Sequence, residues 1–467
     1  MMMPLTLAQM ADQMRTSLGA TLHNGDVSFS RVTTDTRQLQ AGDLFVALRG
    51  ERFDAHDFLA EAAAKGVCGL VVESFDANVA LPQLVVSNTM LALGQIAACN
   101  RAAFSGPLIA ITGSSGKTTV KTMLTCILRE RGAVLATQGN LNNHIGVPLT
   151  LLQLEPKHEY AVIEMGASGL GEIAYLCSLA TPSIAMINNV MPAHIAGFGS
   201  IDNVAIAKAE IYQGLIANGA AIVNLDDRYA AQWLAQLTDK QVIKVSLQNE
   251  SADCFARDIK VTADGVTFVL VIRQESMSVQ LNALGEHSVR NALMAAACAC
   301  AAGANIQQIR NGLQKFTPVA GRMTRQTGLK GMQVIDDSYN ANPGSVRAAI
   351  DVLAAQEGTR VLVLGDMGEL GNDAEQLHAD LGAYARARGI DKLLTVGVLS
   401  QHASEAFAGA GLASGAQHFA EQQTLIYALA SMANKNMTVL IKGSRSAKTD
   451  LIVRALCDSS TSTGEPH

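Results

Sequence analysis

A short run of small and basic residues, Thr112 to Thr119, carries the strongest chemical signal in the sequence. It reads Thr-Gly-Ser-Ser-Gly-Lys-Thr-Thr, after an apolar stretch at 108–111 and before a helical pattern at 120–131. Glycines let backbone N–H groups approach an anion, a lysine supplies a compact positive charge, and a threonine hydroxyl is a ligand for Mg²⁺. The run therefore predicts a phosphate-binding loop for a nucleotide, made by Gly113, Ser114, Ser115, Gly116, Lys117, Thr118 and Thr119.

This loop departs from the usual nucleoside-triphosphate pattern at one position. That pattern has a glycine five residues before its second glycine, and Ile111 occupies the position here. Either the run is a chance Gly/Ser turn before a helix, or it is a tighter variant of the loop. The order of strand, loop, lysine and threonine favours the variant.

Two residues are candidates for holding the Mg²⁺ of a bound nucleotide, because Mg²⁺ prefers oxygen ligands. Thr118 is the first, and Glu164, which follows the apolar stretch 160–163, is the second. A carboxylate at the end of an apolar strand is costly unless it binds something. The alternative is a helix-capping acid before Gly166, and the pattern favours the metal.

His194 and Lys208 are weaker candidates. His194 follows the apolar stretch 183–187 on a predicted loop, where a structural role and a ligand role are equally supported. Lys208 lies in a helical pattern at 205–212 and is either a solvated lysine near Glu210 or a partly desolvated one. A desolvated lysine has a lowered pKa, and its neutral amine can take up CO₂ as a carbamate that binds metal.

Four further positions have side chains suited to a nucleotide. Arg322 and Arg445 can meet phosphate charge, although a surface ion pair is equally supported for Arg445. Asp337, in the polar segment 336–343, can accept hydrogen bonds from ribose hydroxyls or belong to an Asx-rich turn. Asn291 can read an adenine edge or simply lie near the start of a helix.

Composition bounds the class of protein. The chain has 467 residues, 49% of them hydrophobic, which predicts about three domains with sizeable cores. The net charge of −6 argues against a nucleic-acid partner. Eight dispersed cysteines, the lack of a signal peptide and the lack of a long apolar run predict a cytoplasmic protein without a membrane partner.

Short apolar runs that end in polar residues alternate with helical patterns along most of the chain. This alternation predicts an α/β protein with parallel, doubly wound sheets, in which ligands bind beyond the carboxyl ends of the strands. We expect three domains: a small α/β domain at 1–105, a central doubly wound domain with the phosphate loop at 106–318, and a second doubly wound domain at 319–467.

Taken together, these residues resemble the Mur ligase family, the ATP-dependent amide-forming enzymes of peptidoglycan precursor synthesis. The loop at 112–119 is similar to the short phosphate loop of that family, which explains Ile111. Further segments that resemble family signatures lie at 43–50, 53–56, 139–143, 145–148, 337–343, 364–371 and 442–445. The resemblance implies an N-terminal domain for a UDP-sugar, a central ATPase domain and a Rossmann-like C-terminal domain that closes over the site.

The resemblance also implies roles for individual residues. ATP would be bound by the loop, Asn291, Arg322 and Asp337, and two Mg²⁺ ions would be held, one by Thr118 and Glu164 and one by His194 and a carbamylated Lys208. The catalytic residues would be Lys117, His194, Lys208 and Arg322. The muramoyl and peptide substrates would be bound by Thr34, Asp35, Thr36, Arg37, Asn143, Asn340, Asn342 and Arg445.

Within the family, the signatures are most similar to the ligase that joins D-alanyl-D-alanine to UDP-N-acetylmuramoyl-tripeptide. The implied reaction passes through an acyl phosphate and gives the pentapeptide, ADP and phosphate, with the monomer as the working unit. Three alternatives stay open at this point: a sister ligase that adds the third residue, a kinase, and a nucleotide-binding switch. The Asp-Asn-Pro-Arg motif typical of the sister ligase is absent from the sequence.

Overall fold

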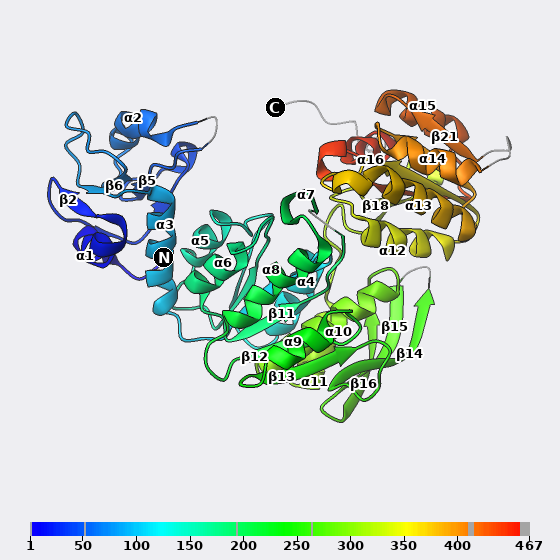
Figure 1. The fold of residues 1–467 in the computed structure, drawn as a ribbon, viewed down its shortest axis with the longest axis horizontal. Helices are drawn as coiled ribbons and strands as arrows, with labels where there is room; N and C mark the ends of the chain where they lie inside the picture. The colour runs from blue at the N-terminus through cyan, green and yellow to red at the C-terminus, as the bar shows by residue number, and fades with distance from the viewer. Residues whose placement is uncertain (1, 51–52, 193–194, 263–264, 410–414, 458–467) are drawn as a thin grey trace.

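Three larger β-sheets organise the chain, and each comes from a different stretch of sequence (Figure 1). The computed structural model describes residues 2–50, 53–192, 195–262, 265–409 and 415–457. The three sheets lie within residues 21–85, 108–281 and 324–442, so each predicted segment contains one of them. The boundaries between the segments stay predictions.

The N-terminal sheet has the strand order β2-β7-β6-β5-β4. Its strands are β2 (Thr21–His23), β4 (Val32–Thr33), β5 (Leu44–Val46), β6 (Gly69–Val72) and β7 (Gln83–Val85), with α1 (Leu7–Leu18) and α2 (Leu59–Ala64) packed nearby. The long helix α3 (Thr89–Ala102) leads from this sheet to the central domain (Figure 1). Near its end, the buried Asn100 side chain donates hydrogen bonds to the carbonyls of Leu151 and Leu154, which ties the helix to the central domain.

The central sheet has nine strands in the order β16-β15-β14-β13-β12-β11-β8-β10-β9. Seven of them run parallel: β8 (Leu108–Thr112), β9 (Val134–Ala136), β10 (Tyr160–Glu164), β11 (Ile184–Ile187), β12 (Ala220–Asn224), β13 (Gln241–Ser246) and β14 (Cys254–Thr262). Alternate side chains of β8 face opposite ways. Leu108 and Ala110 pack with α5 (Gly146–Leu151), α6 (Glu172–Ala180) and α8 (Ile201–Gln213).

The other face of the sheet is covered by α4 (Lys117–Leu128), α10 (Glu286–Ala301) and α11 (Ile306–Gln314). Ile109 and Ile111 pack against them. Helices therefore cover both faces, and the prediction of a doubly wound sheet is confirmed. The shorter helices α7 (Ile195–Phe198) and α9 (Ala230–Gln236) complete the domain.

One part of the central sheet differs from the prediction of a parallel arrangement. Strands β15 (Gly265–Ile272) and β16 (Glu275–Leu281) run antiparallel to their neighbours. Their two-residue turn is made by Arg273 and Gln274, with φ of 49° and 69°. Hairpin turns of this kind usually carry Asn or Gly, so the Arg-Gln pair gives no turn signal in the sequence.

The C-terminal sheet has the order β17-β18-β22-β19-β20-β21, and only β17 is antiparallel. Its strands are β17 (Thr324–Thr327), β18 (Gln333–Asp337), β19 (Thr359–Gly365), β20 (Lys392–Val396), β21 (Ala416–Phe419) and β22 (Met437–Lys442). Helices α12 (Pro343–Ala354), α13 (Ala374–Ala387) and α14 (Ser400–Ala408) cover one face, and α15 (Gln422–Met432) and α16 (Asp450–Cys457) the other. The predicted Rossmann-like domain is confirmed.

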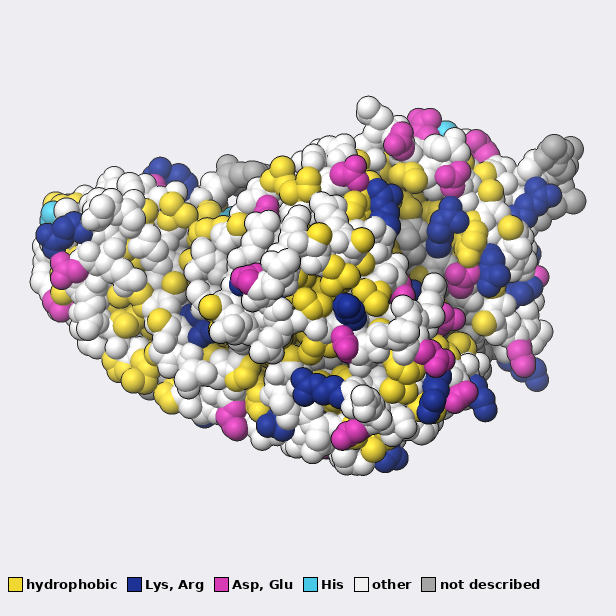
Figure 2. Space-filling view, turned by 60° about the horizontal axis from the view of Figure 1, so that its bottom comes forward, with side chains coloured by type: hydrophobic (Ala, Val, Ile, Leu, Met, Phe, Trp, Pro, Cys, Tyr) yellow, Lys and Arg dark blue, Asp and Glu magenta, His cyan; other side chains and the backbone are white. Residues whose placement is uncertain are grey.

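The surface in Figure 2 shows Lys and Arg side chains scattered among acidic and hydrophobic ones. Among the described residues, no helix has the length and apolar character needed to cross a membrane. None of the eight cysteines, all of which the structure describes, forms a disulfide. The predicted lack of a nucleic-acid partner stays a prediction.

Candidate active site

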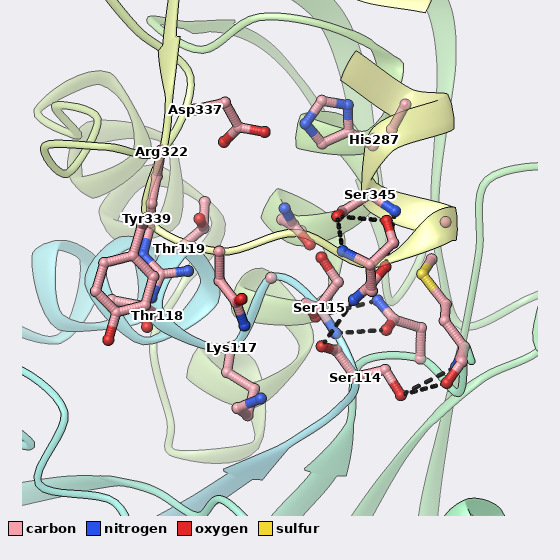
Figure 3. A pocket seen from close by; sticks show the side chains of 18 of the residues that line it. Ser114, Ser115, Lys117, Thr118, Thr119, His287, Arg322, Asp337, Tyr339 and Ser345 are labelled. Atoms are coloured by element: carbon pink, nitrogen blue, oxygen red, sulfur yellow. Dashed lines mark hydrogen bonds between the residues drawn. The ribbon is translucent and has the colours of Figure 1, made fainter. Parts of the chain in front are cut away.

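A cavity of about 440 Å³ lies beyond the carboxyl ends of the central strands and is bordered by the C-terminal domain (Figure 3). Residues of the phosphate loop, of α10 and of segments 321–323 and 337–345 line it. The connection from β10 to β11 crosses over β8, so the strand order reverses beside the loop that follows β8. Such a reversal is the usual ligand position in doubly wound sheets.

Two asparagines at the end of β11 hold the phosphate loop. The backbone N–H groups of Ser114 and Ser115 donate to the backbone and side-chain oxygens of Asn189, both at 2.9 Å. The Asn188 amide donates in return to the Ser115 carbonyl at 2.8 Å. These hydrogen bonds use the backbone groups at the start of the loop. The first turn of α4, which follows, has no side-chain cap. The N–H groups of that turn are therefore free to bind phosphate oxygens.

Gly116 occupies a position that only glycine fits. Its φ is +77°, and a Cβ there would lie 2.4 Å from Asn188 Nδ2 and 2.7 Å from Asn291 Oδ1. Those two asparagines also bond to each other at 2.9 Å, through Asn188 Nδ2 and Asn291 Oδ1. The loop, the end of β11 and α10 therefore meet at Gly116.

Lys117 folds back over the loop, where its ammonium donates to the Gly113 carbonyl at 2.7 Å. Burial is the main cause that lowers the pKa of Lys117, the Glu164 carboxylate opposes that effect, and Arg322 adds to it. A buried ammonium with no carboxylate in contact is stabilised when an anion arrives.

Thr118 and Glu164 form the oxygen pair that the sequence predicted for Mg²⁺. The Thr118 hydroxyl donates to Glu164 Oε2 at 2.9 Å, and the Asn142 amide donates to Oε1 at 2.8 Å. Lys121 Nζ lies 3.7 Å from Oε2. Among the described residues no three His, Cys, Asp or Glu side chains form a metal cluster. A pair of protein oxygens suits Mg²⁺, which keeps waters and takes nucleotide oxygens as further ligands.

Lys208 lies on α8 and lines the same cavity with 3% of its surface exposed. Within the described part of the chain, its ammonium makes no hydrogen bond or ion pair. Burial, and after it the charge of Lys117, lowers the pKa of Lys208 to about 7. His194, the other residue predicted beside it, lies outside the described residues.

The opposite end of the cavity is less polar and is formed largely by α10. Asn291 and His287 lie on this helix, and Ala283, Leu284 and Phe316 lie close by. His287 faces the cavity but is surrounded by protein, and burial lowers the pKa of its imidazole to about 4. An apolar wall with a neutral imidazole and an amide suits a nucleobase.

Asp337, from β18, forms a buried ion pair with Lys442 at the end of β22. Burial raises the pKa of Asp337, and Lys442 opposes that rise. Lys442 also donates to the Asn340 carbonyl at 2.9 Å, which fixes the loop after β18. Asn342 caps α12, and its amide lies 3.5 Å from the Ser114 carbonyl, so it links the C-terminal domain to the phosphate loop.

The remaining predicted residues lie in different places. Arg322 and Asn143 line the cavity, whereas Arg445 and the segment Thr34–Arg37 do not. In that segment Asp35 caps a short turn and forms an ion pair with Arg37 at 2.8 Å, on the N-terminal domain. Asn143 accepts hydrogen bonds from the backbone at the start of α5.

Several residues in or beside the cavity were not predicted individually from the sequence, among them Lys121, Asn142 and Tyr339. Lys121 is four residues after Lys117, a spacing that places both on one face of α4 and was available as a signal. Asn142 and Tyr339 lie in segments that the analysis noted, but no pattern distinguishes them there from ordinary loop residues.

Fold and site together define a nucleotide-binding α/β enzyme whose phosphate loop and Rossmann-like C-terminal domain border the same cavity. Comparison with known families gives three matches: the Mur ligase family catalytic domain at residues 28–100, the Mur ligase middle domain at 111–299, and the Mur ligase glutamate ligase domain at 321–445. The chain belongs to the Mur ligase family and is an enzyme of the ligase class.

Among the proteins similar to this chain are ligases that share one name. The chain is 44% identical to the UDP-N-acetylmuramoyl-tripeptide–D-alanyl-D-alanine ligase of Escherichia coli (strain K12), over 98% of this chain and 100% of that protein. The ligase of the same name from Bacillus subtilis (strain 168) is 34% identical, over 92% and 93% of the two chains.

Solved structures give the same result. MurF from Acinetobacter baumannii superposes with a TM-score of 0.89 at 37% identity, over 97% of this chain and 98% of that one. MurF ligase from Thermotoga maritima, solved in complex with ADP, has a TM-score of 0.82 at 26% identity, over 91% and 96% of the two chains.

The close packing of Gly116 generates a prediction. Substitution Gly116→Ala should weaken ADP binding at least about tenfold, because the new methyl group would displace both asparagines and strain the positive φ. Isothermal titration calorimetry with ADP measures the effect. Gly171→Ala is the matched control, since Gly171 has φ of +82° but open space around its Cβ position. Equal ADP affinities in the two variants would contradict the packing argument.

Proposed function

We propose that this chain uses ATP to join D-alanyl-D-alanine to UDP-N-acetylmuramoyl-tripeptide. The main support is the similarity to ligases of that name along nearly the whole chain, together with a cavity that the phosphate loop and the C-terminal domain share. The products are UDP-N-acetylmuramoyl-pentapeptide, ADP and phosphate, and an acyl phosphate of the tripeptide is the intermediate.

The residues of the chain have the following roles in this proposal. The free N–H groups at the start of α4 and the ammonium of Lys117 bind the phosphates of ATP, and Arg322 meets their charge from the C-terminal domain. Asn291 and the apolar wall of α10 hold the adenine, and Asp337 faces the ribose. The cavity excludes water, which would otherwise hydrolyse the acyl phosphate.

Thr118 and Glu164 would hold one Mg²⁺ ion, and His194 with Lys208 would help to hold a second. When bound, the ions offset the repulsion between the tripeptide carboxylate and the triphosphate. The protein side of this arrangement is the pair of oxygens 2.9 Å apart and the donors that orient Glu164.

The uridine-nucleotide end of the substrate is assigned to Thr34, Asp35, Thr36 and Arg37, and its peptide end to Asn143, Asn340, Asn342 and Arg445. We propose that the monomer is the working unit. Eight cysteines without a disulfide accord with the reducing cytoplasm, where we place the enzyme.

An assay with purified substrates tests the reaction. With ATP, Mg²⁺, UDP-N-acetylmuramoyl-tripeptide and D-alanyl-D-alanine, ADP and phosphate release should require both the tripeptide and the dipeptide. Mass spectrometry should find the pentapeptide. Lys117→Met should lower kcat at least about 100-fold, because it removes the positive charge that stabilises the phosphates of ATP. Tripeptides ending in diaminopimelate and in lysine should both be tried. Phosphate release that ignores the dipeptide would contradict the ligase reaction.

We further propose that Lys208 carries a carbamate, formed when its neutral amine attacks CO₂ and loses a proton. The support is a buried amine without a partner among the described residues. With ¹³C-labelled CO₂ at constant dissolved concentration, a carbamate carbon signal should appear in NMR spectra. It should grow between pH 6 and pH 8, because the neutral fraction rises from about one-tenth to about nine-tenths around a pKa near 7.

Two variants decide whether that signal belongs to Lys208. Lys208→Met should abolish it, whereas Lys121→Met should keep it, because the Lys121 nitrogen already donates to the Thr137 carbonyl at 2.7 Å and lies 3.7 Å from Glu164 Oε2. A signal that survives in Lys208→Met, or a wild-type protein without any signal, would reject the carbamate.

A further inference from the structure

One aromatic ring meets two arginines from separate segments. The guanidinium carbon of Arg322 lies 4.1 Å from the centre of the Tyr339 ring, and that of Arg445 lies 5.9 Å from it. Arg322 precedes β17, Tyr339 follows β18, and Arg445 follows β22. Figure 3 shows the Arg322 side chain running to the Tyr339 ring at the cavity wall.

Within the described ranges, neither guanidinium makes a hydrogen bond or an ion pair. An aromatic face attracts a guanidinium through its quadrupole and uses none of its N–H groups. An arginine held by an ion pair would instead spend its donors on a carboxylate. All the N–H groups of Arg322 therefore stay available for a ligand in the cavity.

The backbone fixes the ring relative to Arg322. Tyr339 N–H donates to the Gly321 carbonyl at 3.1 Å, immediately before Arg322. Gly321 has φ of +73°, and a Cβ there would lie 3.2 Å from Tyr339 Cβ. The antiparallel pairing of β17 with β18 thus places Arg322 beside the Tyr339 ring.

The charged side chains around Arg322 would pull it out of position if the ring did not hold it. Arg322 lies near enough to Asp337 to lower the pKa of that carboxyl, while Lys117 and Lys121 are near enough to feel its positive charge. A loose arginine would move away from the two lysines and toward Asp337, where it would no longer face the phosphate loop.

We propose that Tyr339 is a positioning residue, whose ring holds Arg322 ready to receive the anionic oxygens of a bound nucleotide. The inference rests on the proposed function only in taking ATP as the ligand. It concerns binding, so its test needs neither peptide substrate, and failure of the ligase assay would leave it standing.

Calorimetry with Mg²⁺ and a non-hydrolysable ATP analogue tests the role of the ring. Tyr339→Leu should weaken binding roughly 3- to 30-fold, the range that corresponds to one cation–π contact, and Tyr339→Phe should stay close to wild type. Tyr384→Leu is the matched control, because Arg347 lies 4.7 Å from the Tyr384 ring and neither residue lines the cavity. This control should bind like wild type.

A double variant separates positioning from a general structural role. In an Arg322→Met background the cation that the ring holds is gone, so adding Tyr339→Leu should cost little further affinity. A full additional loss in that background, or wild-type affinity in Tyr339→Leu, would overturn the proposal. If Tyr339→Leu does not fold, Tyr339→Met makes the same comparison, with the melting temperature of each variant measured alongside.

Discussion

The close approach of the phosphate loop to Asn188 and Asn189 is the contact on which the rest of the site depends. Parallel pairing of β8 with β11 sets Thr112 opposite Ile187, so the loop and the two asparagines leave the sheet together. The fit is tight, because a Cβ at Gly113 would lie 2.9 Å from the Asn188 Cβ. The asparagines satisfy the start of the loop and leave the helix N-terminus to the ligand. Through the hydrogen bond from Asn188 to Asn291, the same contact also ties the loop to α10.

The cavity carries more positive than negative charge among its described residues, and this imbalance explains its chemistry. Lys117 and Arg322 face it without an ion pair, whereas Asp337 is already paired with Lys442. Buried charges without partners are costly, so the free protein holds a site that is stabilised when a polyanion enters. Because some of these groups come from the C-terminal domain, a nucleotide in the cavity would contact both domains.

Local patterns in the sequence predicted much of this structure. Apolar runs such as 108–111 and 438–441 became buried parallel strands, because only such runs can be buried on both faces. Gly113, Gly116, Lys117 and Thr118 follow from the chemistry of a phosphate loop. The β15–β16 hairpin could not be foreseen, since its turn residues Arg273 and Gln274 adopt positive φ without a glycine.

Contacts between distant segments were beyond reach of the sequence for a different reason. The meeting of Arg322, Tyr339 and Arg445 depends on the order β17-β18-β22 in the C-terminal sheet, and no local pattern contains that order. The same holds for Asn188 and Gly116. In each case the residue types were visible, but the sheet topology decided which of them touch.

If one nucleotide site is built from two domains, a bound nucleotide should protect the backbone amides of both. Amide hydrogen exchange, followed by mass spectrometry with and without Mg²⁺ and a non-hydrolysable ATP analogue, measures this. The ligand should slow exchange in the phosphate loop, at 113–119, and also in the C-terminal segments 321–323 and 337–342. Protection confined to the phosphate loop, with the C-terminal segments unchanged, would contradict a site built from two domains.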